Sequence, residues 1–592
     1  MTTEMVIVFC VIILAVFLFA TEKIPVDLTA LIVMGILLLS KIITPSEGIS
    51  GFSNTATITV GAMFIVSAAL KKTGAVNYIG FITSKIFKYN FWIGLIGTMV
   101  VVGIVSAFIN NTPVVAIFIP ILLGVAVDNK ISPSKLLMPI SFASMFGGVC
   151  TLIGTSTNIL VSSIAVQHGL PAFTMFEFSS LGLIFFVAGL IYMITLGIKL
   201  LPKKEYESEL TQKYRMNDYL TDIVLLPNAK SVGTKLIESP LVKELEIDIL
   251  EVIRDNHRLL TPLHEIIFQA NDVLRVRCDL KKIQKLQDRV GIAFKAQHNL
   301  HDKDFKSDDL ILSEVIIAPN SDLVGKTIKT SRFRNVYRAN ALALRHSGQL
   351  YNLGFSNTVL KAGDALLIEI RKEDYNELIN NKNFVFVSNL ELPKYRKSKI
   401  IPALLIITGI ILTATLEILP IMVSAIIGSI LLIITKCITL EEAYKSIEWN
   451  VIFLLGGILS LGIALEKTGA ALLISNKLIE VLGDFGPYAI IAAFYLLTSL
   501  LTETMSNNAT AVLLAPIAIA ASATLGLSPK PFLMAITFAA SASFMTPVGY
   551  QTNTMIYGVG QYKFSDFLKV GTPLNLIFWI LATIFIPVFF PF

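Results

Sequence analysis

The chain contains two long regions that repeat one another at a nearly constant offset. Residues 1–204 and residues 394–592 align with a shift of about 395 positions, with one inserted residue that is later compensated. The matching pairs include Lys72 and Lys467, Gly74 and Gly469, Asn111 and Asn507, Pro120 and Pro516, Gly154 and Gly549, and Asn158 and Asn553. Because the matches keep one order along both regions, we interpret the chain as a duplicated unit with a separate segment between the copies.

Both copies are strongly apolar. The chain is 54% hydrophobic and 15% charged, whereas soluble domains carry about 25% charged residues. Stretches long enough to cross about 30 Å of hydrocarbon occur at residues 5–21, 26–43, 56–70, 178–198, 400–416, 421–435, 451–465 and 571–590. We therefore predict a polytopic α-helical protein of the cell membrane. A duplicated membrane unit is typical of secondary transporters.

Basic residues mark the ends of the two copies next to the intervening segment. They are Lys199, Lys203 and Lys204 on one side, and Lys394, Arg396, Lys397 and Lys399 on the other. Positive charge beside membrane helices favours the cytoplasmic side, so we predict that the insert is cytoplasmic. If residues 91–109 and 111–127 form a re-entrant hairpin, the first copy crosses the membrane five times. An odd number of crossings predicts that the second copy is inverted.

The insert is itself a tandem repeat with an offset of about 92 residues, in which Asp272 matches Asp364. Alternating apolar residues predict strands at 249–254, 273–277, 341–345 and 365–370, and helices follow at 281–290 and 372–380. We predict two small α+β modules, residues 205–305 and residues 306–393. They resemble the TrkA-C (RCK C-terminal) ligand-binding modules of potassium-conductance regulators. That resemblance implies either a cytoplasmic regulatory ligand or a dimerisation scaffold.

Polar residues interrupt four apolar segments, which match in pairs across the duplication. The first pair is residues 106–113 and 502–509. A tight turn here predicts a helical hairpin whose second helix points its N-terminus into the membrane. Free N–H groups and the helix dipole at such a terminus bind anions, and the side-chain oxygens of Ser106, Asn110 and Asn111 suit a hard cation such as sodium.

The second pair of polar segments is residues 154–158 and 549–553, each inside an apolar helix. Both begin with glycine and continue with hydroxyl or amide side chains. This composition predicts an unwound break with exposed carbonyl groups, where transporters hold coupling ions. Close helix packing by small residues is the alternative interpretation. Since polar groups inside a membrane are costly unless they line a site, the match of all four segments favours a site.

These four segments resemble the divalent anion/sodium symporter family, the sodium-coupled dicarboxylate and sulfate carriers. The family's Ser-Asn-Thr triplets correspond to residues 110–112 and 506–508, with one substitution in each. The resemblance implies a sodium-coupled anion symporter that works as an elevator-type homodimer, with an inverted repeat, re-entrant hairpins and broken helices. It implies sodium ligands at Ser106, Asn110, Asn111, Gly154, Thr502, Ser506, Asn507 and Gly549. It implies a substrate site at Asn111, Thr112, Thr155, Asn507, Asn508, Tyr550 and Gln551.

Two departures from the family pattern bear on the substrate. The family's Pro-Pro pairs are absent, and Tyr550 and Gln551 place bulky hydrogen-bonding side chains in the implied substrate position. A smaller pocket favours sulfate or a similar inorganic oxyanion over a four-carbon dicarboxylate, which is the second candidate. No Arg or Lys lies in the four segments. We therefore expect anion binding to depend on neutral donors, helix dipoles and sodium.

Two further functions are alternatives to symport. A sodium/proton antiporter would need a carboxylate that titrates within the membrane, and Glu503 is the candidate. A ligand-sensing membrane protein without transport is the other alternative. An enzyme is not expected, because no nucleophile–base set, metal cluster or phosphate loop stands out. The expected partners are a small dianion, sodium and the lipid bilayer, with no other cofactor and no nucleic acid.

Overall fold

The computed structural model describes residues 2–21, 24–87, 89–202, 220–244, 247–255, 257–259, 266–277, 291–294, 310–318, 321–346, 349–351, 354–379, 381, 383–386, 396–482 and 485–592. The chain forms two compact units. Residues 1–204 and 389–592 make up the helical unit, and residues 205–388 make up the sheet unit. The two copies of the duplication therefore belong to one unit, although the insert separates them along the chain.

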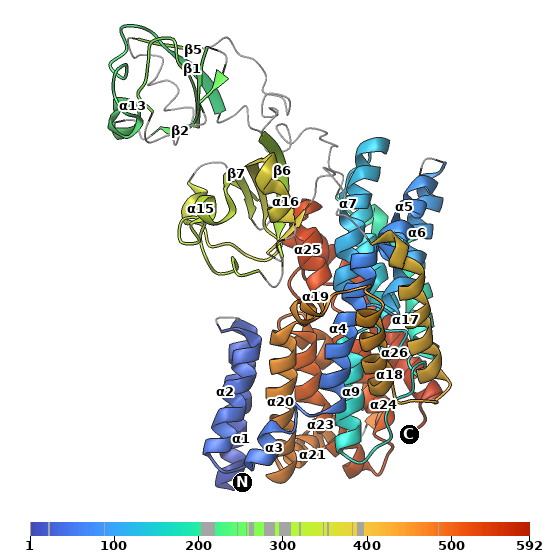
Figure 1. Ribbon diagram of the computed structural model, residues 1–592. Helices are drawn as coiled ribbons and strands as arrows, with labels where there is room; N and C mark the ends of the chain where they lie inside the picture. Colours follow the sequence, from blue (N-terminus) through green and yellow to red (C-terminus); the bar gives the residue numbers. More distant parts are fainter. Residues whose placement is uncertain are drawn as a thin grey trace. The chain divides into compact units, whose positions relative to one another are not determined.

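The first half of the helical unit is a series of helices joined mostly by short connections (Figure 1). Its helices are α1 (Thr3–Thr21), α2 (Val26–Leu39), α3 (Pro45–Ile49), α4 (Thr55–Thr73), α5 (Ala75–Ile86), α6 (Phe91–Ser106), α7 (Asn111–Asn129), α8 (Ser134–Gly148), α9 (Ser156–Gln167) and α10 (Ser179–Tyr192). The last helix continues through a π-helical segment, η1 (Met193–Gly197), into α11 (Ile198–Leu200).

The second half has matching helices in the same order. After a short 3-10 turn, η7 (Lys397–Lys399), they are α17 (Ile400–Thr415), α18 (Ile421–Ile434), α19 (Leu440–Ser446), α20 (Trp449–Lys467), α21 (Ala470–Leu482), α22 (Gly486–Thr502), α23 (Asn507–Leu525), α24 (Lys530–Ala540), α25 (Gln551–Val559) and α26 (Phe564–Phe589). α2 and α18 begin at equivalent positions, as do α7 and α23. The repeat in sequence is therefore a repeat of helix order.

Seven helices in the described part of the chain are long and apolar enough to cross a membrane: α4, α7, α10 with its continuation to α11, α17 with η7, α20, α23 and α26. The predicted stretches 5–21, 26–43 and 421–435 form α1, α2 and α18, whose apolar parts (Thr3–Phe19, Val26–Leu39 and Ile421–Ile434) are shorter. These findings confirm a helical, mostly membrane-type protein. α7 and α23 are themselves long enough to span, so the re-entrant form of the hairpins stays a prediction.

The signals that start the helices are duplicated as well. Thr44 and Glu47 form a capping box at α3, and Thr439 and Glu442 form the same box at α19. In each box the threonine hydroxyl accepts the N–H of the glutamate, whose carboxylate accepts the N–H of the threonine. Two N–H groups that have no partner inside the helix are thereby paired, and such a cap typically contributes about 1 kcal/mol.

Equivalent helices of the two halves make equivalent contacts with the opposite half. α2 packs along α20, and its counterpart α18 packs along α4. Two ion pairs repeat the exchange: Lys467 Nζ lies 2.7 Å from Glu47 Oε1, and Lys72 Nζ lies 3.3 Å from Glu442 Oε1. Each lysine pairs with the glutamate of the other half. This is the relation expected of two copies around a two-fold axis.

Glycine allows very close backbone contacts in the helical unit, for example at Gly147 and at Gly51. Gly147 of α8 faces Gly103 of α6 so closely that a Cβ on Gly147 would overlap the Gly103 carbonyl oxygen. A Cβ on Gly51 would overlap the carbonyl oxygen of Gly456 in the same way. Small residues at membrane helix contacts let backbones approach in this manner. The contact at Gly147 fixes α8 against α6, and both helices lead to polar segments predicted from the sequence.

The sheet unit contains two five-stranded antiparallel sheets (Figure 1). The first consists of β1 (Leu220–Leu225), β2 (Asp248–Arg254), β3 (His257–Arg258), β4 (Val273–Arg277) and β5 (Ile292–Phe294), in the order β3-β2-β4-β1-β5. The second consists of β6 (Leu310–Ile317), β7 (Ala339–His346), β8 (Gln349–Tyr351), β9 (Ala365–Arg371) and β10 (Phe384–Phe386), in the order β8-β7-β9-β6-β10. The offset of about 92 residues is thus a repeat of strand topology.

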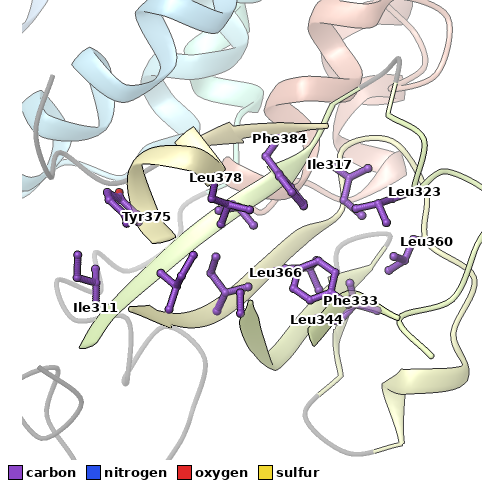
Figure 2. Close-up of a cluster of buried hydrophobic side chains, with 14 of the residues drawn as sticks. Ile311, Ile317, Leu323, Phe333, Leu344, Leu360, Leu366, Tyr375, Leu378 and Phe384 are labelled. Carbon is purple, nitrogen blue, oxygen red and sulfur yellow. The ribbon is translucent and has the colours of Figure 1, made fainter. Parts of the chain in front are cut away.

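Short helices accompany the strands, and each sheet has a hydrophobic core. The helices are η3 (Leu236–Glu238), α13 (Pro240–Lys243), α15 (Phe333–Tyr337), η6 (Phe355–Asn357) and α16 (Lys372–Ile379). Figure 2 shows the core of the second sheet, where Leu378 of α16 and Phe384 of β10 gather with Leu344 and Leu366 of the sheet. Full burial of such a side chain is worth about 1.5–3 kcal/mol. Phe268 and Leu274 belong to the separate core of the first sheet.

The predicted strands agree with the structure where it describes them. The stretches predicted at 249–254, 273–277, 341–345 and 365–370 coincide with β2, β4, β7 and β9, and the helix predicted at 372–380 is α16. The helix predicted at 281–290 lies outside the described residues. The module boundaries and the TrkA-C resemblance stay predictions.

We expect Gly147→Ala to destabilise the helical unit by roughly 1–3 kcal/mol, because the new Cβ would force α8 away from α6. Gly97→Ala on α6 is the matched control, since a Cβ there would meet only Ile86 Cδ1, at 4.0 Å. The melting temperature of the purified protein in detergent measures the difference. Equal melting temperatures for the two variants would contradict the importance of the close contact.

Candidate functional site

Each half contains two helices joined by a short polar turn. In the first half α6 ends at Ser106 and α7 begins at Asn111; in the second half α22 ends at Thr502 and α23 begins at Asn507. Ser106, Asn111 and Thr502 are at most 1% exposed. The helix–turn–helix segments predicted from the sequence therefore form, and their turns present polar side chains to the interior.

The second helix of each pair is capped by a side chain from the turn. Asn110 Oδ1 accepts the N–H of Thr112 at 3.4 Å, and Ser506 Oγ accepts the N–H of Ala509 at 3.3 Å. These caps fix where α7 and α23 start. The positive end of each helix dipole lies at that start.

Each half also contains an unwound segment between two helices, which we call the first and second break. The first break is residues 149–155, between α8 and α9, and the second is residues 541–550, between α24 and α25. The breaks predicted at 154–158 and 549–553 are therefore placed several residues too far along the chain. Thr155 and Tyr550 have extended backbones, after which the helix begins at once. Residues 156–158 and 551–553 consequently form the first turns of α9 and α25.

An equivalent threonine ties each break to the turn of its own half. Thr151 Oγ1 donates a hydrogen bond to the carbonyl oxygen of Ala107, and Thr546 Oγ1 donates to the carbonyl oxygen of Glu503 at 3.0 Å. Thr151 and Thr546 are 395 positions apart, so this bond is part of the duplicated structure. Neither threonine was predicted from the sequence, although their match across the duplication is the signal that would have found them.

In each half, an asparagine in the helix after the break donates a hydrogen bond to a carbonyl oxygen within the break. Asn158 Nδ2 donates to the carbonyl oxygen of Thr151 at 2.8 Å, and Asn553 Nδ2 donates to that of Thr546 at 3.3 Å. Both asparagines are at most 1% exposed. Ser141 Oγ of the first half donates to Asn553 Oδ1 at 2.8 Å. The polar residues in the first turns of α9 and α25 therefore hold the breaks in shape.

The turn of the first half meets the second break. Asn111 Nδ2 donates to the Tyr550 hydroxyl at 2.7 Å, and Thr112 Oγ1 donates to Gln551 Oε1 at 2.8 Å. The Tyr550 hydroxyl also lies close enough to the side chain of Thr155 to interact with it. Five of the seven predicted substrate residues thus form one network that crosses between the halves.

The turn of the second half meets the first break in the reciprocal way. Ser156 Oγ and Thr157 Oγ1 donate to Asn508 Oδ1 at 3.1 and 3.3 Å. Asn508 is a sixth predicted substrate residue. The seventh, Asn507, instead accepts a hydrogen bond from Thr502 Oγ1 at 2.8 Å. Ser156 and Thr157 were not among the predicted substrate residues.

These contacts bring the N-termini of α7, α9, α23 and α25 to one buried region. Each of these helices has nine or more residues, and each N-terminus carries about half a positive charge. No Lys, Arg or His occurs in the segments that meet there, residues 106–113, 149–158, 502–509 and 541–553. Neutral donors and helix dipoles therefore make this region suitable for an anion.

Two side-chain oxygens of the first half, Ser106 Oγ and Asn111 Oδ1, are buried and have no hydrogen-bond partner among the described residues. The amide nitrogen of Asn111 is bonded across the halves, which leaves Oδ1 facing Gly148. A Cβ on Gly148 would lie 2.5 Å from this oxygen, and a Cβ on Gly154 would lie 3.0 Å from the carbonyl oxygen of Ala107. We call these three oxygens and two glycines the first oxygen cluster. A hard cation such as sodium fits it, since unpaired buried oxygens are costly.

A second oxygen cluster surrounds Gly549. A Cβ on this residue would lie 3.0 Å from the carbonyl oxygen of Thr502, 3.0 Å from Thr546 Oγ1, and in overlap with Ser543 Oγ. Ser541 Oγ, in the same break, is buried without a hydrogen-bond partner in the described chain. We call Gly549 and the three oxygens around it, of Thr502, Thr546 and Ser543, the second oxygen cluster.

The oxygen atoms of the second cluster differ from the sodium ligands that the sequence predicted for this half. Thr502 Oγ1 and Asn507 Oδ1 are bonded to one another, and Ser506 Oγ caps α23. The hydroxyls of Ser541 and Ser543 were missed. Their counterparts at 146 and 148 are phenylalanine and glycine, so the duplication gave no signal for them.

Glu503, the candidate for an antiporter, is 5% exposed. Its carboxylate accepts the backbone N–H groups of Met545 and Thr546, each at 2.9 Å, and Asn575 Nδ2 at 3.0 Å. The carboxylate therefore serves to hold the second break. Because these hydrogen bonds give the carboxylate a structural role, they do not favour a sodium/proton antiporter in which Glu503 exchanges protons.

A family model for citrate transporters matches residues 16–528, which include most of both halves. The chain belongs to the citrate transporter family. This family lies within the divalent anion/sodium symporter superfamily, so the resemblance found in the sequence is confirmed at that level. The match does not test the TrkA-C resemblance of the insert.

Relatives cover nearly the whole of this citrate transporter family member. An uncharacterized transporter of Synechocystis is 38% identical over 96% of this chain and 94% of its own length. Uncharacterized transporter YfbS of Escherichia coli is 32% identical over 100% of both chains. Sodium/sulfate cotransporter 1 of Chlamydomonas reinhardtii is 23% identical over 92% of this chain and 85% of its own length. The protein is thus a multi-pass membrane transporter, and these relatives are named as transporters and not as enzymes.

We expect Thr151→Val and Thr546→Val each to destabilise the protein by about 1–3 kcal/mol, because each leaves a buried carbonyl oxygen unpaired. Thr546→Val should cost more, since this hydroxyl also accepts the N–H of Gly549 at 2.9 Å. Thr583→Val is the control, because Thr583 Oγ1 bonds to a carbonyl of its own helix. Melting temperatures in detergent provide the measurement. If Thr583→Val lowers the melting temperature as much as Thr151→Val and Thr546→Val do, the role given to the two threonines is refuted.

Proposed function

We propose that this citrate transporter family member is a sodium-coupled secondary symporter of a small inorganic oxyanion, with sulfate as the first candidate. One observation carries the proposal: four helix N-termini meet in a buried region whose segments contain no basic residue. An anion bound there would lack a basic partner, so a nearby cation would be needed to balance its charge. Two relatives that bear the name sodium/sulfate cotransporter support the same pairing of ions.

Sodium is the proposed coupling ion in both halves. The proposed ligands are Ser106, Asn110, Asn111 and Gly154 in the first half, and Thr502, Ser506, Asn507 and Gly549 in the second half. The unpaired oxygens of Ser106 and Asn111 support the first set. In the second set Thr502 contributes through its carbonyl oxygen, and we add the hydroxyls of the second oxygen cluster.

The proposed substrate site lies between the turns and the breaks. Tyr550 and Gln551 reach across it to Asn111 and Thr112, which leaves little room for a long substrate and supports a compact oxyanion. A C4 dicarboxylate is the second candidate, because the family model is that of citrate transporters. Competition by succinate against labelled sulfate distinguishes the two substrates.

We propose that the two halves run in opposite directions across the membrane. Near the end of α9, Ser163 is hydrogen-bonded to Asn54, which caps the start of α4. His168 Nε2, just after α9, lies 3.4 Å from Glu466 Oε2, near the end of α20. The start of α4 and the end of its counterpart α20 therefore lie about one and a half turns apart along one helix. Equivalent helices that point in opposite directions support an inverted repeat.

The remaining architecture is proposed from the resemblance. The protein would work as an elevator-type homodimer in the cell membrane, with the sheet unit in the cytoplasm. The sheet unit would regulate transport through a ligand of its TrkA-C-like modules. Two observations support a regulatory role: each sheet has its own core, and none of the candidate site residues lies in the sheet unit.

In proteoliposomes we expect uptake of labelled sulfate to require an inward sodium gradient and to exceed uptake of succinate. Asn111→Ala and Asn507→Ala should each abolish this uptake, because both remove an amide oxygen from a turn beside a proposed sodium site. Asn129→Ala is the matched control at the other end of α7, where Nδ2 bonds to a carbonyl of its own helix. Uptake without sodium, or full uptake by both turn variants, would overturn the proposal.

A further inference from the structure

The two breaks have unequal lengths, and this asymmetry has a structural cause. The first break starts after Gly148, whereas the second starts after Ala540, whose counterpart in the first half is Met145. α24 thus ends nearly one turn earlier than α8. Backbone N–H groups that find acceptors inside α8 and just after it must find other acceptors in the second half.

Glu503 provides acceptors for two N–H groups of the second break. In the first half the N–H of Cys150 donates to the carbonyl oxygen of Gly147 at 3.0 Å. At the equivalent position the N–H of Met545 donates to Glu503 Oε1, and the next N–H, that of Thr546, donates to Glu503 Oε2. Both carboxyl oxygens accept N–H bonds, and an ionised carboxylate, which has acceptors only, satisfies both donors.

The charge of Glu503 has no counterpart in the first half, where the equivalent residue is Ala107. The described groups that face Glu503 are all neutral: two backbone N–H groups, the amide of Asn575 and the hydroxyls of Thr546 and Ser543. The described part of the chain contains no ion pair of Glu503. An isolated negative charge inside a membrane protein is costly, and a cation bound nearby would offset that cost.

The second oxygen cluster is directly connected to this carboxylate. The carbonyl oxygen of Thr502, one residue before Glu503, belongs to the cluster. Thr546 donates its N–H to the carboxylate, and its hydroxyl belongs to the cluster. A cation in the cluster would therefore lie near the Glu503 carboxylate, whereas a cation in the first cluster would face oxygens without an acidic side chain beside them.

We propose that Glu503 is a positioning residue that makes the second oxygen cluster the tighter of the two sodium sites, so that sodium binds there first. This inference rests on the proposed sodium coupling. Glu503 acts through the second break and the electrostatic field, without contacting the transported anion. Since α25 begins where this break ends, the first sodium ion would stabilise the segment that presents Tyr550 and Gln551 to the substrate.

The test measures sodium binding in the absence of any anion substrate. The full-length protein in detergent is titrated with sodium chloride, with choline chloride holding the ionic strength, and its melting temperature gives the apparent sodium affinity. We expect a tight and a weak phase in the unmodified protein. Glu503→Gln keeps the size and one acceptor oxygen but removes the charge, so it should weaken the tight phase roughly tenfold or more.

Glu503→Asp keeps the charge with a shorter side chain, and should retain the tight phase more closely than Glu503→Gln. Glu480→Gln, at an exposed carboxylate of α21 paired with Lys477, should change nothing. An unchanged tight phase in Glu503→Gln, or equal weakening in the Gln and Asp variants, would overturn the inference while leaving sodium coupling intact. An unmodified protein without any sodium effect would instead overturn the proposed function itself.

Discussion

The hydrogen bonds that join the turn of one half to the break of the other half determine the rest of the site. Asn111 with Tyr550, and Asn508 with Ser156, hold four helix N-termini at one place. Neither half could form the region alone, because each supplies two of the four helices. The reciprocal packing of α2 on α20 and of α18 on α4 repeats the same dependence in the surrounding helices.

The chemistry of the site follows from the helix N-termini and buried oxygens that these contacts bring together, and from the absence of basic side chains in the segments that form it. Helix dipoles and neutral donors attract an anion, but the segments contain no basic side chain that would neutralise it. Buried oxygens close to the same turns, among them Ser106 Oγ and Asn111 Oδ1, lack protein partners in the described chain. An anion and a cation placed side by side would satisfy both groups of atoms, which is the physical basis of the proposed symport. Glu503 adds a charge to one side only.

Much of this arrangement could be predicted from the sequence, because the duplication fixes the helix order and marks the polar segments in pairs. The helix–turn–helix segments followed from those matches, and the resemblance to the symporter family placed Asn111 and Tyr550 in one substrate site. The limits of the breaks did not, because tertiary contacts decide how much of each segment stays helical. In the second half the Glu503 carboxylate accepts two N–H groups of the break. Ser541 and Ser543 were missed for a related reason: residues unique to one copy give no repeat signal.

Linkage between the two ions tests the central claim most directly. The affinity for sulfate is measured by calorimetry at several sodium concentrations, and the affinity for sodium is measured with and without sulfate. If the two ions neutralise each other in one site, each should raise the affinity of the other by the same factor, typically about 5- to 150-fold. The same sulfate affinity in sodium and in choline would contradict a site in which the anion depends on sodium.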